Sequence, residues 1–149
     1  RRFPIFEKVD RLEQADKHDE ALGMLDEALE KRGSSAKLRN ARCWYLALRN
    51  TALDTALTDC NKAIELEADP AMYMDSRALV HFRAGRLKEA MADYEAALAA
   101  EPEQTASLFM ASIVADRMGD KVKAAALLKA AKTVFPDVGH FYAHYGIKP

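Results

Sequence analysis

The sequence predicts an all-α protein, an α-solenoid of about four helix-turn-helix repeats that ends in a short C-terminal capping helix. Three observations lead to this fold class. Small residues recur every 34 or 35 positions along nearly the whole chain of 149 residues. Apolar residues follow helical spacing within each copy. Glycine (6 residues) and proline (5 residues) are scarce, which disfavours strands and long loops.

The repeat is clearest in the second half of the chain. A glycine, two alanines and a proline return 34 residues later, so that Gly85, Ala90, Ala97 and Pro102 correspond to Gly119, Ala124, Ala131 and Pro136. The alanine positions also recur earlier, as Ala56 and Ala63 and as Ala21 and Ala28. Four copies in one frame predict a single domain over residues 1–149, with repeats at about 2–36, 37–70, 71–104 and 105–138 and a cap at 139–149.

The first copy predicts helices over residues 4–16 and 19–32. Ala21 and Ala28 are small enough to let the two helices of the pair approach closely. Gly33 stands where the later copies have a proline, and it is suited to ending the second helix. The first copy therefore departs from the later ones mainly at its end.

The second copy predicts helices over residues 37–49 and 53–68. It is the least regular copy, because it has Thr51 at the turn between its helices and two extra residues before Pro70. The register of this copy is therefore set to within a residue or two.

The third copy predicts helices over residues 71–84 and 87–100. Gly85 suits the left-handed turn that ends the first of them, and Pro102 cannot continue the second. The fourth copy repeats this pattern at 105–118 and 121–133. A last helix near 137–145 is expected to cover the apolar face of the final repeat, with Phe141, Tyr142 and Tyr145 on its apolar side.

Within each copy, counted from residues 2, 37, 71 and 105, alanine stands at positions 20 and 27, with a bulky residue at 24 in most copies and, in the later copies, proline near 32. This pattern resembles the tetratricopeptide repeat of bacterial proteins. The resemblance covers nearly the whole chain. It implies a right-handed solenoid whose first helices line a concave groove that holds a peptide. Position 4, often tryptophan in that family, differs here: it is Ile5, Asn40, Met74 and Leu108.

The resemblance also implies which side chains line the groove. The candidate partner-binding residues are Tyr45, Arg49, Met72, Asp75, Leu79, Phe82, Arg83, Phe109, Asp116 and Arg117. Arginine recurs at one position of three successive copies, as Arg49, Arg83 and Arg117. Such a ladder suits an extended peptide with acidic groups. It is equally explained by the favourable interaction of a cation with a helix C-terminus.

Two cysteines, Cys43 and Cys60, would face one another within the second helix pair of a tetratricopeptide arrangement. One interpretation is a disulfide, which requires Cα atoms within about 7 Å and would place the protein in the periplasm or outside the cell. The other is a pair of buried thiols in a reducing cytoplasm, the default location for a chain with no visible targeting signal. The sequence leaves both open.

No motif in the sequence points to catalysis, a cofactor or a metal. His140 and His144 have the spacing of metal ligands on a helix but lack a third ligand, so we interpret them as surface histidines. A net charge of −1 argues against nucleic-acid binding, and no apolar run reaches the ~18 residues of a membrane span. The chain begins Arg1-Arg2-Phe3 without methionine, so we expect the native start to be missing.

The sequence therefore predicts a non-enzymatic scaffold that holds an extended or helical segment of a partner protein in its groove. Two alternatives remain. The chain is then either the C-terminal docking or regulatory domain of a larger enzyme, or a self-associating structural module. In the latter case, copies would stack end to end through Phe3 and Phe6 or through Tyr142 and Tyr145. For the chain in general we expect a monomer or weak self-association.

Overall fold

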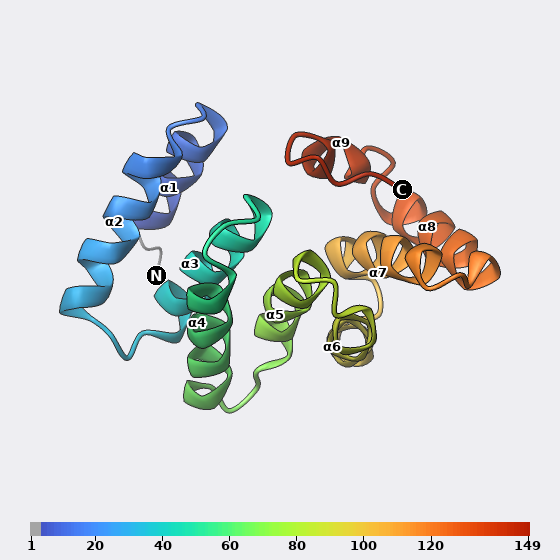
Figure 1. Ribbon diagram of the computed structural model, residues 1–149, viewed down its shortest axis with the longest axis horizontal. Coiled ribbons are helices and arrows are strands. Elements are labelled where there is room, and N and C mark those ends of the chain that lie inside the picture. Colours follow the sequence, from blue (N-terminus) through green and yellow to red (C-terminus); the bar gives the residue numbers. More distant parts are fainter. Residues whose placement is uncertain (1–3) are drawn as a thin grey trace.

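A computed structural model describes residues 4–149 of the chain. Over this range it contains nine helices and no strand, which confirms the all-α fold class. Eight of the helices form four antiparallel pairs that follow one another along an arc (Figure 1). Helix ends differ from the predicted ends by at most two residues. The helices are α1 Pro4–Gln14, α2 His18–Lys31, α3 Ala36–Leu48, α4 Leu53–Leu66, α5 Ala71–Arg83, α6 Leu87–Ala100, α7 Thr105–Arg117, α8 Lys121–Val134 and α9 Val138–Ala143.

The turn inside each pair contains a residue with positive φ that ends the first helix. These residues are Asp16, Asn50, Gly85 and Gly119, with φ between 54° and 87°. Glycine, asparagine and aspartate tolerate this left-handed conformation better than other residues do. The recurrence of such residues at 34- or 35-residue spacing therefore encodes the reversal of the chain.

The second pair corrects two details of the predicted register. Its turn residue is Asn50 rather than Thr51, because the turn between α3 and α4 is one residue longer than the other turns. Ala52 consequently also has a positive φ, of 48°. The expected extra residues before Pro70 are absent, since the loops 67–70 and 101–104 are equally long.

The core lies between the two helices of each pair and between neighbouring pairs. Both recurring alanine positions are buried in every repeat, so each pair packs closely. Larger residues fill the space between them, among them Leu25 and Tyr94, which are fully buried. The first helices of neighbouring pairs also contact each other, α3 with α5 and α5 with α7. Among the described helices, the second helices make no comparable contact, so the first helices lie on the inner, concave side of the arc.

Arg42 connects three helices of the first two repeats. Its guanidinium donates two hydrogen bonds to Asp59 on α4, at 2.6 and 2.9 Å, and one to Asp26 on α2, at 2.9 Å. Arg77 makes the equivalent contacts one repeat later, to Asp93 on α6 at 2.8 and 2.9 Å and to Asn61 on α4 at 3.1 Å. An arginine on the first helix therefore connects each of these helix pairs to the preceding pair.

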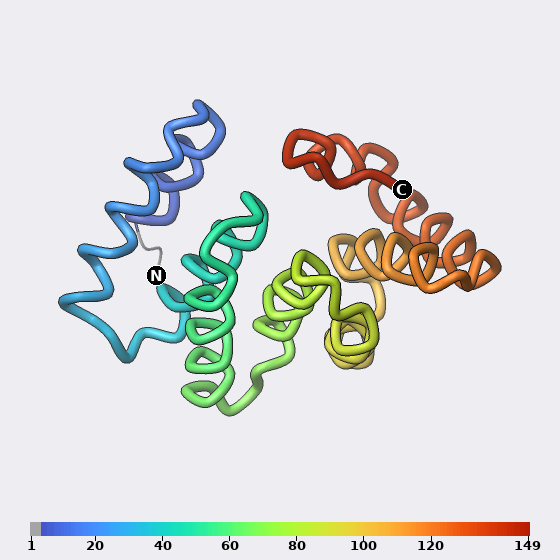
Figure 2. Tube along the Cα trace, in the orientation of Figure 1, coloured from blue at the N-terminus to red at the C-terminus, as the bar shows by residue number. Residues whose placement is uncertain are grey.

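Helix α9 is present as predicted and packs on α7 of the final repeat. It turns back across the concave side and points toward α1 (Figure 1). Figure 2 shows the first and last parts of the chain on the same side of the arc. The outer face of α8 stays open, and Val122 on it is 84% exposed. No described helix is long and apolar enough to cross a membrane.

Candidate peptide-binding face

The concave face is largely covered by the chain's own residues 138–149, which we call the C-terminal segment. The ring of Tyr142 stacks on Phe109, with centroids 5.2 Å apart, and Ile147 is buried in the same core. Gly139 passes so close to Phe109 that a Cβ atom would stand 3.4 Å from its ring. Three predicted groove residues, Leu79, Phe82 and Phe109, are therefore buried within the molecule.

Two of the predicted arginines bind backbone carbonyls of the C-terminal segment. Arg83 donates to the carbonyl of Tyr145 at 2.9 Å, and burial lowers its pKa. Arg117 donates to the carbonyl of Lys148 at 3.3 Å, and its guanidinium lies 5.3 Å from the centre of the Phe82 ring. The guanidiniums thus hold backbone carbonyls of the turn and tail after α9 rather than acidic groups.

Arg49, the third member of the predicted ladder, has different surroundings. Its Nη2 lies 4.0 Å from the carboxylate of Asp19, and its Nη1 is buried without a hydrogen-bond partner. Burial raises the pKa of the Tyr145 hydroxyl, and the positive charge of Arg49 partly opposes this rise. The three arginines therefore share a repeat position but not a role.

The middle of the C-terminal segment reaches the end of α1 and the turn that follows it. Tyr145 donates its hydroxyl to Glu13 at 3.2 Å, and His144 Nε2 lies 3.0 Å from Asp16. Glu13 is buried and also contacts the ring of His18 at 2.9 Å. The C-terminal segment thus links the first repeat to the last across the open side of the arc.

Trp44 on α3 supplies an aromatic surface for the same segment. Phe141 stacks on it with ring centroids 5.6 Å apart and planes inclined by only 4°. Trp44 was not among the predicted groove residues, because it falls between the groove positions that the resemblance implies. Trp44 is the single tryptophan of the chain, and this was the feature of the sequence that could have marked it as a binding residue.

Beside Trp44 a part of the concave face stays open. It forms a hollow of about 280 Å³ lined by Phe6, Asp10, Lys37, Asn40, Ala41, Trp44, Tyr45, Met72 and Tyr73. Met72 is 59% exposed, which is unusual for a large apolar side chain. Tyr45 donates its hydroxyl to Asp10, whose pKa is raised by burial and by the charge of Glu13. Of the predicted residues, Tyr45 and Met72 thus line an open site.

The two predicted acidic residues lie in contrasting places. Asp75 accepts a hydrogen bond from Ser107 at 2.7 Å, and burial raises its pKa to about 6. The negative charge of Asp75 adds to the rise in the pKa of Tyr142 that burial causes. Asp116 instead forms a surface ion pair with Lys121 at 2.7 Å. Asp75 therefore belongs to the floor beneath the C-terminal segment.

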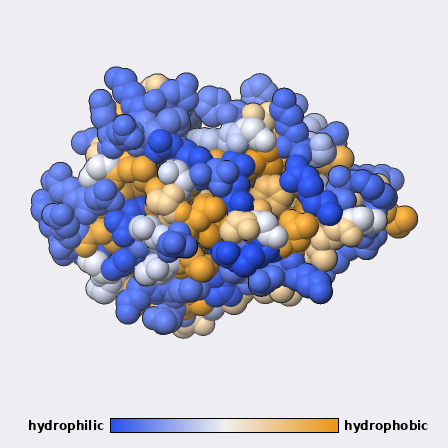
Figure 3. All heavy atoms as spheres, in the orientation of Figure 1, coloured by the Kyte–Doolittle hydropathy of each residue, from blue (hydrophilic) through white to orange (hydrophobic). Residues whose placement is uncertain are grey.

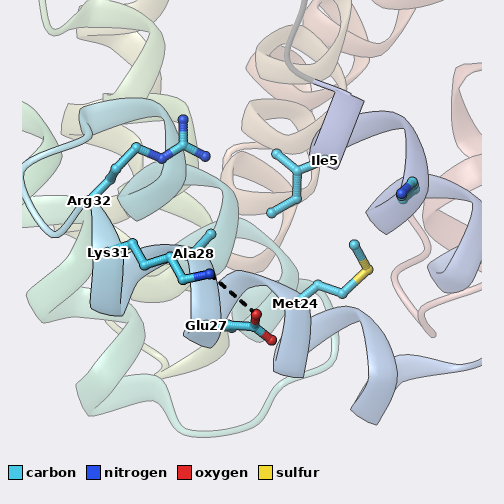
Figure 4. A pocket seen from close by; sticks show the side chains of 7 residues that line it. Ile5, Met24, Glu27, Ala28, Lys31 and Arg32 are labelled. Atoms are coloured by element: carbon cyan, nitrogen blue, oxygen red, sulfur yellow. Dashed lines mark ion pairs between the residues drawn. The ribbon is translucent and has the colours of Figure 1, made fainter.

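A second hollow lies at the other face of the first repeat, between α1 and α2 (Figure 4). Ile5, Met24 and Ala28 supply its apolar lining, and an ion pair between Lys31 and Glu27, 3.6 Å long, borders it. In the face seen in Figure 3, apolar side chains form separate patches between hydrophilic ones. No single apolar surface dominates that face.

The expected contacts for end-to-end stacking are only partly available. Tyr142 is buried and the Tyr145 hydroxyl is bound to Glu13, so the C-terminal aromatic rings face inward. This corrects the expectation that they form an exposed end. Phe6 lines the hollow beside Trp44, and Phe3 lies outside the described residues.

Cys43 and Cys60 are joined by a disulfide, with Cα atoms 5.6 Å apart. Of the two interpretations that the sequence left open, the structure contains the bonded form. Among residues 4–149, no three His, Cys, Asp or Glu side chains gather as a metal site requires. His140 is exposed, and His144 is paired with Asp16.

Solved structures of similar fold include two of MamA. One is 15% identical, covers 93% of this chain and 84% of its own, and has a TM-score of 0.68. The MamA RS-1 ArsTM double mutant is 19% identical, covers 95% and 79%, and has a TM-score of 0.69. YrrB, described as a TPR protein with an unusual peptide-binding site, is 17% identical and has a TM-score of only 0.48.

At these identities the likeness establishes the fold and leaves function open. No profile of a known protein family matches the sequence, and no curated protein matches it. The helix pairs, their 34- to 35-residue period and the likeness of fold make the chain a TPR-like helical repeat protein.

Proposed function

We propose that this protein is a non-enzymatic interaction module that binds a peptide segment of a partner protein at the hollow beside Trp44. The observation that carries the proposal is the exposure of Met72 in a concave site lined by four aromatic residues, Phe6, Trp44, Tyr45 and Tyr73. An adaptable thioether beside aromatic rings is typical of surfaces that receive apolar side chains.

The chemistry of the hollow favours an apolar anchor over an acidic one. Its volume of about 280 Å³ suits one or two bulky side chains, and Asp10 and Lys37 lie at its edge as polar contacts. The Arg83 and Arg117 guanidiniums are engaged by backbone carbonyls, so they offer little to a partner carboxylate. We therefore assign the partner a segment with large apolar side chains.

A selection from a library of displayed random peptides tests this proposal. Selected peptides are expected to lose at least tenfold in affinity for Met72→Glu, because a carboxylate there would be desolvated by the bound apolar anchor. Val122→Glu is the matched control, since Val122 is an even more exposed apolar residue on the outer face of α8. Peptides that bind Met72→Glu as tightly as the wild type would refute the proposed site.

We further infer that the protein folds in an oxidising compartment. The Cys43–Cys60 disulfide supports this, because such bonds persist mainly in secreted and periplasmic proteins. Titrating thiols in the denatured protein, purified from its native source under alkylating conditions, should detect none before reduction and two after it. Two free thiols before reduction would overturn the inference.

A further inference from the structure

We propose that the C-terminal segment is an internal ligand of the concave face, and that this face accepts in its place partner segments with the same chemistry. That chemistry is a short helix with two adjacent aromatic side chains, followed by a turn and an irregular backbone. This inference rests on the proposed function, because it names the class of partner and the competitor that the partner must displace.

The segment is held mainly by two aromatic contacts. Neighbouring residues of α9 point to different receptors: Phe141 stacks on Trp44 at 5.6 Å and Tyr142 stacks on Phe109 at 5.2 Å. Phe141 nevertheless stays 42% exposed, so its stack lies at the surface. Because Trp44 also lines the open hollow, the internal ligand and the hollow form one continuous face.

Two of the remaining contacts do not depend on the segment's own side chains. Arg83 and Arg117 donate to the carbonyls of residues 145 and 148, and any peptide backbone supplies carbonyls. Sequence preference on this face therefore comes mainly from the two aromatic rings, with the polar contacts of Tyr145 and His144 and the buried Ile147 adding to it. The arginines set the direction and position of the bound backbone.

The helix of the segment has little stability of its own. It spans six residues, Val138–Ala143, whereas isolated helices shorter than about 12 residues are marginal in water. The exposed stretch Phe135-Pro136-Asp137 joins it to α8. A helix that depends on its receptor and is joined through a short surface link can be exchanged for a partner helix that makes the same contacts.

Tethering sets how strongly the segment competes. A flexibly linked ligand has an effective concentration of the order of millimolar, so a free peptide of micromolar affinity is strongly outcompeted. We therefore expect the intact protein to bind partner peptides weakly until the internal contacts are weakened.

The test uses the full chain and a fluorescein-labelled synthetic peptide of residues 137–149. The double variant Phe141→Ala/Tyr142→Ala removes the internal aromatic anchors and leaves Trp44 and Phe109 intact. Its affinity for the peptide, measured by fluorescence anisotropy, is expected to be at least tenfold higher than that of the wild type. His140→Ala, on an exposed position of the same helix, is the matched control and should behave as the wild type.

An equal affinity of the folded double variant and the wild type would overturn the inference. If the double variant does not fold, a protease site inserted after Pro136 allows the segment to be cut after folding. Dilution of the cut protein should then shift the emission of Trp44, the single tryptophan, as Phe141 leaves it. An emission unchanged down to nanomolar concentration, where a peptide of micromolar affinity has dissociated, would likewise refute exchange.

The two proposals fail in different ways. In one outcome, the selected peptides bind Met72→Glu more weakly, but the 137–149 peptide binds the wild type and the double variant equally. The hollow then stays a binding site, and the internal competitor is refuted. Binding of the 137–149 peptide to the double variant, with no effect of Met72→Glu on selected peptides, leaves the competitor but refutes the hollow.

Discussion

Arg83 and Tyr145 are 62 residues apart in the sequence, and the guanidinium of one donates to the carbonyl of the other at 2.9 Å. The same guanidinium also donates to the carbonyls of Ala47, at 2.9 Å, and Leu48, which are the last residues of α3. One side chain therefore joins the second repeat, the third repeat and the C-terminal segment. This arrangement makes Arg83 a structural centre of the concave face.

Replacing Arg83 by methionine should destabilise the protein by about 2–4 kcal/mol, because it removes the side-chain donor from the carbonyls of Leu48 and Tyr145, while that of Ala47 keeps the amide of Asn50. Arg117→Met is the control, since Arg117 makes a single hydrogen bond of 3.3 Å at the surface and should cost less than about 1 kcal/mol. Urea denaturation followed by circular dichroism measures both. Equal losses for the two variants would contradict the role assigned to Arg83.

Asp59 is 1% exposed and accepts hydrogen bonds from both Arg39 and Arg42. Asp59→Asn removes the buried charge, so that Arg39 loses its carboxylate partner and Arg42 keeps only Asp26, and we expect a loss of about 3 kcal/mol or more. Asp116→Asn should cost under about 0.5 kcal/mol, because Asp116 pairs with Lys121 at the surface. A cost for Asp59→Asn as small as that of Asp116→Asn would show that the pair contributes little.

The disulfide closes a loop with a sequence separation of 17 residues within the second repeat. Restricting the unfolded chain in this way contributes about 3 kcal/mol. The double variant Cys43→Ala/Cys60→Ala should therefore unfold at lower temperature, and added reductant should lower the melting temperature of the wild type but not of the variant. A wild type that is insensitive to reductant in calorimetry would contradict this prediction.

Asp75 should make stability fall as the pH rises. Its folded-state pKa of about 6 lies above the ordinary value of 3.8, so between these two values the folded state binds the proton more tightly than the unfolded state. The stabilisation is complete below about pH 4 and is lost as the pH rises through 6. Asp75→Asn should therefore gain up to about 3 kcal/mol relative to the wild type on going from pH 4 to pH 7. Parallel pH profiles of the two proteins in urea denaturation would contradict this prediction.

Ala52 has a φ of 48°, which is strained for a residue with a Cβ atom. Ala52→Gly removes the strain and should raise the free energy of unfolding by about 1 kcal/mol. Ala84→Gly is the matched control, because Ala84 follows α5 with an ordinary φ of −82° and should lose stability. Thermal melts should show a higher melting temperature for Ala52→Gly and a lower one for Ala84→Gly than for the wild type.

Local patterns in the sequence were sufficient to predict the repeats and most helix ends. Alanine spacing identifies the buried face of the second helix in each pair, and glycine ends α5 and α7 where predicted. The second turn was misplaced by one residue, because Asn50 takes the glycine-like conformation that was sought at Thr51. The Arg42–Asp59 and Arg77–Asp93 pairs were missed, although their recurrence after 35 and 34 residues was visible in the sequence.

The sequence by itself determined the number of helix pairs, their period and the residues at the turns between them, because each depends on contacts within one repeat. Only the tertiary structure decided what covers the concave face. An aromatic helix such as α9 can cover any apolar surface, and periodicity carries no information about which one. The long-range contacts of Phe141 with Trp44 and of Tyr145 with Arg83 make that choice, and they turn most of the predicted groove into a buried interface.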